Sequence, residues 1–278
     1  MILLAGGTGR LGGVLTARLT ELGLPVRVLT RDPARAARLS GYGIEVAVGD
    51  VRDRASLAPA VRGVETVVSA VHGFTGKGGV SPATVDRQGN LNLVDAAASA
   101  GADLVLMSVV GAAAYSPMEL FRMKYAAEQY LRASGMAWTI VRATAFLELW
   151  IEVLSRTAGR SGRPVVFGHG NNPVNFVSVT DVAALVEKAI IDPATRGRVL
   201  EIGGPASRTF NQLASEVQEA AGRTSQPRHV PPAVLKIMAG TLGRVRPEFG
   251  RMTRAALIMD RDDFTHHAEL PQAAGAVS

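Results

Sequence analysis

The sequence predicts an α/β fold in which a doubly wound parallel sheet is followed by a small C-terminal substrate lobe. Short apolar runs alternate with amphipathic segments along most of the chain, which is typical of repeated strand-helix units that cover both faces of one sheet. A glycine-rich turn separates the first apolar run from the first amphipathic one. Sheets of the Rossmann type bind a dinucleotide at such a turn, so this is the architecture we expect.

The glycine turn is the strongest sign of a binding site. Its residues are Gly6, Gly7, Thr8, Gly9, Arg10, Leu11 and Gly12. The spacing G-x-x-G-x-x-G provides a tight turn, a close approach of the backbone to a diphosphate, and close packing of the next helix. The diphosphate would lie at the helix N-terminus, where free N–H groups converge. A simple turn of small residues looks similar, but the strand at 26–30 completes a strand-helix-strand unit and favours a dinucleotide.

Apolar periodicity places the other elements. Strands are expected from Met1 and at 26–30, 44–48, 66–71, 104–108, 138–142 and 199–203, with an extended segment at 174–179. Helices are expected at 14–22, 34–40, 56–61, 85–100, 117–134, 180–191, 210–221 and 233–242. The residues Ser116, Pro117 and Glu119 form the pattern of a capping box at the start of one of these helices.

The end of the second strand indicates the cofactor. An NAD-specific site would place a carboxylate there, about 20 residues after the glycines, to bind the ribose 2′-hydroxyl. This chain has Thr30 followed by Arg31, whose forked guanidinium suits a 2′-phosphate, and Arg10 and Arg35 would add to the same pocket. The alternative is that Arg31 is an ordinary loop arginine and Asp32 a helix N-cap. We therefore predict NADP rather than NAD.

Further candidates follow the later strands. Asp50, with Val51 beside it, would accept a hydrogen bond from adenine, although Asp50 or Asp53 is also suited to a loop or N-cap role. Ser69, Ala70 and Val71 end the fourth strand, Ser108 ends the fifth, and Lys124 lies on the next helix. With the glycine turn and Arg31, these residues outline an extended dinucleotide. We expect residues 1–145, completed by 174–204, to form the NADP-binding core, 146–173 and 205–265 a substrate-side lobe, and 266–278 a flexible tail.

Composition limits the partners. The net charge of +6 and the pI near 10.1 would suit nucleic acid, but the arginines are scattered and not interleaved with aromatic residues. No apolar run has the length of a membrane span, and cysteine is absent. We therefore expect a cytoplasmic protein with a small apolar substrate, no nucleic-acid or membrane partner and no metal. A homodimer is left open.

Several motifs together resemble one known family. They are 6–12 (GGTGRLG), 30–33 (TRDP), 49–50 (GD), the helix with Lys124, Glu128, Leu131, Ser134 and Gly135, and 139–142 (TIVR). This combination is similar to the short-chain dehydrogenase/reductase superfamily, in its atypical NmrA-like branch, over about residues 1–205. The resemblance implies that Arg31 binds the adenosine phosphate, Asp50 approaches adenine, and Lys124 reaches the nicotinamide ribose. It also implies that Thr144 to Phe146 lie beside the nicotinamide.

One departure from the superfamily concerns the chemistry. The usual catalytic pair is Tyr-x-x-x-Lys, in which the lysine charge lowers the tyrosine pKa. Four residues before Lys124 this chain has Leu120, which cannot donate a proton. Lys124, Ser108 and Tyr115 are the remaining catalytic candidates. His72 also stands at a strand end, but lone histidines are more often structural. His266 and His267, in a polar tail, are better explained by solvent exposure than by a metal.

Two classes of function follow. The first is an NADPH-dependent oxidoreductase that transfers hydride to an apolar quinone, enone or activated carbonyl, which does not need the tyrosine because the cofactor supplies the hydride. Its apolar lobe would contain Phe146, Leu149, Trp150, Val234, Leu235 and Met238. The second is a non-catalytic NADP(H)-binding sensor or scaffold, and a sugar-nucleotide epimerase is a weaker third. Lys124 has its own alternative, an exposed pair with Glu128 one helical turn away.

Overall fold

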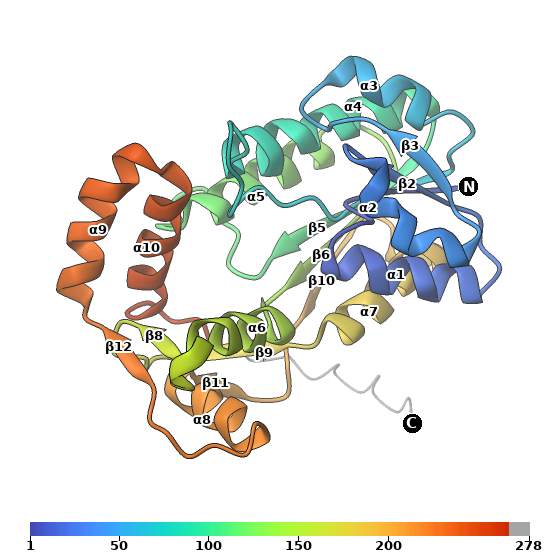
Figure 1. The fold of residues 1–278 in the computed structure, drawn as a ribbon. Helices are drawn as coiled ribbons and strands as arrows, with labels where there is room; N and C mark the ends of the chain where they lie inside the picture. The colour runs from blue at the N-terminus through green and yellow to red at the C-terminus, as the bar shows by residue number, and fades with distance from the viewer. Residues whose placement is uncertain (267–278) are drawn as a thin grey trace, which may run out of the picture.

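The central sheet confirms the predicted fold class. The computed structural model describes residues 1–266, and within them seven strands, all parallel, form one sheet in the order β10-β6-β5-β4-β1-β2-β3 (Figure 1). The strands are β1 (Ile2–Ala5), β2 (Val26–Thr30), β3 (Glu45–Val48), β4 (Thr66–Ser69), β5 (Asp103–Val109), β6 (Trp138–Ala143) and β10 (Arg198–Ile202). The chain first builds outward from β1 through β2 to β3, then returns to the other side of β1 with β4.

Helices cover both faces of this sheet (Figure 1). On one face lie α1 (Arg10–Glu21) and α7 (Val179–Ile191), and on the other lie α3 (Arg54–Ala60), α4 (Asn90–Ala100) and α5 (Glu119–Arg132). A short helix, α2 (Pro33–Ala36), follows β2, and a π-helical segment (Pro82–Gly89) runs directly into α4.

The core explains why the strands read as continuous apolar runs. Along β1, Leu4 packs with the layer of α1 and α7, whereas Leu3 packs with the layer of α3, α4 and α5. The same alternation separates Val28 from Leu29 on β2. Successive side chains of a strand point to opposite faces, and here both faces are covered, so apolar residues can occupy consecutive positions such as Leu3 and Leu4.

The C-terminal lobe has its own small sheets. Its strands are β7 (Ala145–Phe146), β8 (Val165–Phe167), β9 (Pro173–Val177), β11 (Ser207–Thr209) and β12 (Arg228–Val230), paired as β11-β9-β7 and β12-β8. Its helices are α6 (Leu147–Ala158), α8 (Phe210–Ala220), α9 (Pro232–Val245) and α10 (Pro247–Met259). The extended segment expected at 174–179 therefore pairs within the lobe, while α7 and β10 return to the core. No helix in residues 1–266 is long and apolar enough to cross a membrane. The tail predicted at 266–278 lies, except for its first residue, outside the described residues.

The capping box expected at Ser116 does not form. The helix α5 begins at Glu119 with Met118 as its N-cap, and the Ser116 hydroxyl accepts a hydrogen bond from the Met118 N–H instead. Capping boxes are found before the π-helical segment, between Ser81 and Thr84, and before α8. Ser116 lies two residues before the N-cap, so its hydroxyl bonds to the turn that leads into the helix. This local hydrogen bond takes the place of the predicted capping box.

A buried ion pair ties α5 to the sheet. Glu128 on α5 is fully buried, and Arg142 on β6 binds both of its carboxylate oxygens, with Nη2 at 2.6 Å and Nε at 3.0 Å. Ser108 on β5 donates a third hydrogen bond to the same carboxylate, and Glu201 on β10 binds the other side of Arg142. The hydrogen bond to Glu128 raises the pKa of Arg142 above its ordinary value.

We predict that the two glutamates bound to Arg142 contribute unequally to the free energy of unfolding. Glu128→Ala leaves Arg142 without its buried partner and should lower the free energy of unfolding by about 3 to 5 kcal/mol. Glu201→Ala, which removes the more exposed partner of the same arginine, should cost less than about 1 kcal/mol. Chemical denaturation of both variants measures the difference, and equal losses would contradict it.

Candidate functional site

The glycine turn lies where the strand order reverses. β1 stands between β4 and β2, and the Ala70 N–H donates to the Ala5 carbonyl at 2.8 Å, so the ends of β1 and β4 run side by side. Gly6 has φ +92°, and a Cβ there would be 2.5 Å from the Ala70 carbonyl oxygen. Only glycine fits this position. Ligands of open α/β sheets bind at this kind of switch point.

The rest of the turn is shaped to receive an anion. A Cβ on Gly12 would be 2.5 Å from Cα of Gly7, so helix α1 packs directly on the turn. Gly9 is the N-cap of α1, and among the described residues a Cβ on Gly9 would meet only the Gly6 carbonyl, at 3.1 Å. The open side of Gly9 therefore faces away from the protein at a helix N-terminus. This cradle fits a diphosphate group.

Arg10 takes a different partner from the one the sequence indicated. Its guanidinium forms an ion pair with Glu152 on α6, and Glu152 also pairs with Arg156 one turn further along that helix. In this structure Arg10 thus connects the glycine turn to the lobe. Leu11, the next residue, is buried in the core beneath α1, and Thr8 lies partly buried in the turn.

The turn after β2 presents Arg31 to solvent. The buried Thr30 hydroxyl donates to the Asp32 carbonyl at 3.0 Å and accepts from the Asp32 N–H, which fixes the turn on which Arg31 stands. Asp32 is the N-cap of α2 and accepts from the Ala34 N–H, as the alternative for this segment required. That role leaves the exposed Arg31 guanidinium available, and Arg35 on α2 is exposed as well.

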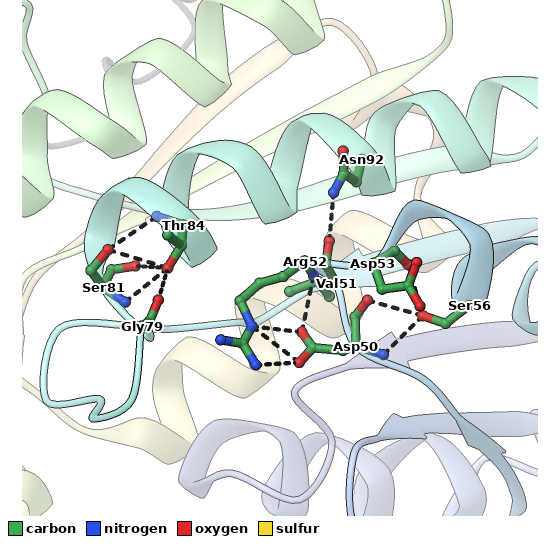
Figure 2. A network of polar contacts seen from close by, with 9 residues as sticks. All are labelled: Asp50, Val51, Arg52, Asp53, Ser56, Gly79, Ser81, Thr84 and Asn92. Atoms are coloured by element: carbon green, nitrogen blue, oxygen red, sulfur yellow. Dashed lines mark hydrogen bonds and ion pairs between the residues drawn. The ribbon is translucent and has the colours of Figure 1, made fainter.

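Asp50 is held by an arginine that the sequence analysis did not single out. Arg52 binds both carboxylate oxygens of Asp50, with Nη2 at 2.6 Å from Oδ2 (Figure 2). This hydrogen bond lowers the pKa of Asp50 despite its partial burial, and Arg31 adds to the effect. Asp53 is the N-cap of α3. Val51 is buried, and its carbonyl accepts from the Asn92 side chain at 2.8 Å.

The loop after β4 closes the same edge. The Thr84 hydroxyl donates to the Gly79 carbonyl at 2.8 Å, and a Cβ on Gly79 would be 3.9 Å from Nη1 of Arg52 (Figure 2). The loop therefore borders the Asp50-Arg52 pair. Arg31 and Arg52 are the basic residues beside Asp50 at the ends of β2 and β3.

Lys124 is buried, not part of a surface pair. Its side chain is 4% exposed, and Nζ donates to the Val71 carbonyl at 3.1 Å and lies 3.1 Å from Oδ1 of Asp86. The alternative that Lys124 pairs with Glu128 on an exposed face is therefore wrong, because Glu128 is turned inward to Arg142. The ammonium lies at the end of β4, on the edge that carries the glycine turn.

Asp86 is the partner that sequence reasoning missed. It lies on the π-helical segment, is fully buried, and accepts from the Gly73 N–H through Oδ2 at 2.9 Å. Nδ1 of His72 is 3.7 Å from Oδ1, the oxygen that faces Lys124. Burial alone would raise the pKa of Asp86, but Lys124, His72 and the Gly73 N–H together hold it below its ordinary value of 3.8. The available signal was an acidic residue on the apolar face of a predicted helix.

The other catalytic candidates lie apart from Lys124. Ser108 is buried and donates its hydroxyl hydrogen bond to Glu128. Tyr115 is 97% exposed in the loop after β5. Ser69 is buried at the end of β4, where it donates to the Asn90 side chain. Of the predicted site residues, Val71 and Lys124 are thus in contact. Ser108 instead binds Glu128, whose ion pair with Arg142 joins α5 to the sheet.

Thr144 and Phe146 mark the point where the chain leaves the central sheet for the lobe. The Thr144 hydroxyl donates to Oδ1 of Asn175 on β9 at 2.9 Å, and the Asn175 amide donates to the Gly204 carbonyl at 3.0 Å. Phe146 packs against the core layer of α1 and α7. Asn175, a buried residue of β9, thus links the segments that follow β6 and β10, and the sequence analysis did not identify it either.

A family model settles the relationship that these motifs indicated. The model of the NmrA-like family matches residues 1–260. The chain belongs to the NmrA-like family. Its curated relatives include the NAD(P)H azoreductase of Xenophilus azovorans, which is 32% identical over 227 residues, or 80% of this chain and 74% of the relative.

Solved structures share the fold of this NmrA-like protein over nearly its whole length. The triphenylmethane reductase of Citrobacter sp., complexed with NADP(H), has a TM-score of 0.77 at 22% identity and covers 96% of this chain and 93% of its own. The NADPH-dependent quinone oxidoreductase of Escherichia coli, complexed with NADPH, has a TM-score of 0.73 at 24% identity and covers 94% and 89%. At these identities the likeness shows the fold.

Asp86 predicts a pH dependence of stability. Its folded pKa lies below 3.8, so ionised Asp86 stabilises the folded state fully above the unfolded value, and this contribution is lost as the pH falls through the folded pKa. Asp86→Asn should therefore destabilise the protein at about pH 7 and lose that effect progressively as the pH falls below 3.8 through the folded pKa. Denaturation at several pH values tests this, with the exposed Asp262→Asn as control. A deficit that does not change with pH would contradict the charge argument.

Proposed function

We propose that this NmrA-like protein is an NADPH-dependent oxidoreductase that transfers hydride to an apolar acceptor of the quinone, enone or activated-carbonyl class. The observation that carries the proposal is the buried ammonium of Lys124, held at the same sheet edge as the glycine cradle. Relatives named as azoreductase, quinone oxidoreductase and triphenylmethane reductase support the reaction type.

The residues at the sheet edge suit an NADP cofactor bound across residues 1–145. The glycine turn would hold the diphosphate, Arg31 with Arg35 the 2′-phosphate, and the Asp50-Arg52 pair would border the adenine. Ser69, Ala70 and Val71 would line the middle of the cofactor. The bound nicotinamide supplies the hydride, and the protein supplies binding, orientation and charge.

Lys124 is placed to act on both cofactor and acceptor. An ammonium group has three N–H donors, of which one is taken by the Val71 carbonyl and one faces Asp86. The third remains for the nicotinamide ribose. Because Asp86 and Val71 fix the nitrogen, its charge would stay in place to stabilise negative charge that develops on the acceptor.

The lobe favours an apolar acceptor. Leu120, which occupies the position of the usual tyrosine, packs against the apolar cluster that contains Met118, Leu154 and Phe176. Trp150 on α6 meets Phe210 edge to face at 4.7 Å. Of the six residues expected in the lobe, Leu235 is fully buried, whereas Leu149 and Val234 stay largely exposed. We assign this lobe, residues 146–173 and 205–265, to acceptor binding.

The second candidate, an NADP(H)-binding sensor or scaffold without catalysis, is favoured by Leu120, since this position cannot donate a proton. Multiple-turnover NADPH oxidation with a panel of quinones, enones, activated carbonyls and azo dyes distinguishes the oxidoreductase from the sensor. Turnover above the rate without protein supports the oxidoreductase. NADPH binding without turnover of any acceptor would reject the oxidoreductase in favour of the sensor.

Arg31 should determine the cofactor preference. Wild type is expected to bind NADPH more tightly than NADH, and Arg31→Ala should weaken NADPH binding by about 10- to 100-fold, the value of a charged hydrogen bond. NADH affinity should change little. Arg196→Ala, which removes an arginine paired with Asp103 at the start of β5, is the matched control. Titration calorimetry measures the NADPH and NADH affinities of all three proteins, and equal wild-type affinities for NADPH and NADH would reject the assignment.

Lys124 should matter for both binding and turnover. Lys124→Ala is expected to lower kcat/KM by about 10- to 100-fold, because it removes ribose positioning and a charge near the developing anion. Lys188→Ala, an exposed lysine on α7, should leave kcat/KM at the wild-type value. Steady-state kinetics with cofactor titration compares them. If Lys124→Ala retains both NADPH affinity and turnover, the lysine serves only the fold.

A further inference from the structure

Nitrogen groups of two side chains converge on one buried oxygen. Oδ1 of Asp86 lies 3.1 Å from Nζ of Lys124 and 3.7 Å from Nδ1 of His72. Yet among the described residues it is the one buried side-chain polar atom without an aligned hydrogen bond, because the aligned bond of Lys124 goes to the Val71 carbonyl. A buried, charged acceptor in this state is costly unless a donor reaches it. Oδ1 of Asp86 can therefore accept a hydrogen bond from Nδ1–H of the His72 ring.

His72 differs from Lys124 in its access to solvent. Its side chain is 47% exposed, whereas Lys124 is enclosed. The His72 ring lies 6.1 Å from the ring of Phe74, which packs on the apolar cluster of the lobe. His72 thus stands between the ammonium at the cofactor edge and the surface proposed to receive the acceptor.

The loop that carries His72 is held at several points. The Gly73 N–H binds Oδ2 of Asp86. A Cβ on Gly73 would be 2.8 Å from Cβ of Val85, so the loop is pressed against the π-helical segment. Further along, Arg251 of α10 donates to the carbonyls of Phe74 at 3.0 Å and Gly76 at 2.8 Å. Such a loop holds a side chain at a fixed place.

We propose that His72 is the proton donor of the reduction, in the role that tyrosine has elsewhere in the superfamily, and that Asp86 is its positioning residue. The proposal rests on the proposed function. With Nδ1–H directed to Asp86, Nε2–H on the other side of the ring is free to face the acceptor. A ring nitrogen held in this way has a defined tautomer and orientation.

The step balances with the partners already named. A neutral quinone, azo or carbonyl acceptor takes one hydride, with its two electrons, from the reductant NADPH. It also takes one proton, from Nε2–H of a protonated His72, onto an oxygen or nitrogen. The N–H bond breaks, the ring becomes neutral, and water reprotonates it because the side chain is exposed. Lys124 keeps its proton and its charge throughout.

A comparison of two acceptors separates the effect of proton donation from that of hydride transfer. A quinone needs hydride and proton, whereas a cationic triphenylmethane dye needs hydride alone, since hydride neutralises its carbocation. Replacing His72 by glutamine should therefore lower kcat/KM for the quinone more than for the dye, and the quinone-to-dye ratio should fall by about tenfold or more. Lys188→Gln, at an exposed lysine on α7 outside the lobe, should keep the wild-type ratio.

The contact with Asp86 has a readout that needs neither cofactor nor turnover. Nitrogen-15 chemical shifts of the histidine rings in the cofactor-free protein report which nitrogen carries the proton. At a pH where the ring is neutral, His72 should carry its proton on Nδ1, the minor tautomer of free imidazole, because Asp86 faces Nδ1. Two other histidines serve as references: Nδ1 of His169 faces Asp260 at 2.8 Å, and Nε2 of His229 faces Asn211 at 2.8 Å.

The outcomes separate this proposal from the function on which it rests. Wild-type protein that binds NADPH but reduces neither acceptor overturns the proposed function and the proton donor with it. Wild type that reduces both, with the ratio unchanged in His72→Gln, overturns the proton donor alone. An Nε2–H tautomer for His72 overturns its positioning by Asp86. A lowered ratio with an Nδ1–H tautomer supports both parts.

Discussion

The buried carboxylate of Asp86 is the interaction on which the site depends. A buried charge is stable only with partners around it, and here two segments supply them: Lys124 from α5, and the His72 ring with the Gly73 N–H from the loop after β4. Each partner is thereby fixed relative to the others. The π-helical segment, with its wider turn, places Asp86 toward these groups, and π-turns are frequent at functional sites.

Core and lobe are joined on both sides of the cofactor edge. Arg10, in the glycine turn, pairs with Glu152 of α6, and Arg251 of α10 binds the loop after β4. The two segments that would enclose a dinucleotide are therefore each tied to the lobe that would bind the acceptor. Movement of the lobe would carry with it the loop that holds His72, so an acceptor bound to the lobe, as proposed, would affect the geometry of the site.

Local sequence patterns predicted the sheet, the glycine turn and the position of Lys124, because these follow from short apolar runs, the 3.6-residue period of helices and the steric needs of glycine. They did not predict what the charged side chains bind. The pairing rule for residues four apart on a helix offered Glu128 to Lys124, but both are buried and find partners on other elements, Arg142 and Asp86. Arg52 likewise binds Asp50 across a turn. Such choices depend on which face each element buries, and only the assembled fold decides that.

Leu120 affects both the packing of the lobe and the proton donors available to the site. At the place where a phenol would act, this chain buries an aliphatic side chain against the cluster around Phe176, which extends the apolar surface of the lobe at the expense of a proton donor. The ammonium one turn further along α5 is retained and is already committed to Val71 and Asp86. Under the proposed function, a proton donor other than Lys124 would come from another element, and the loop after β4 brings a second N–H group, that of His72, near the same carboxylate. Leu120 at the tyrosine position and His72 near Asp86 are both consistent with that proposal.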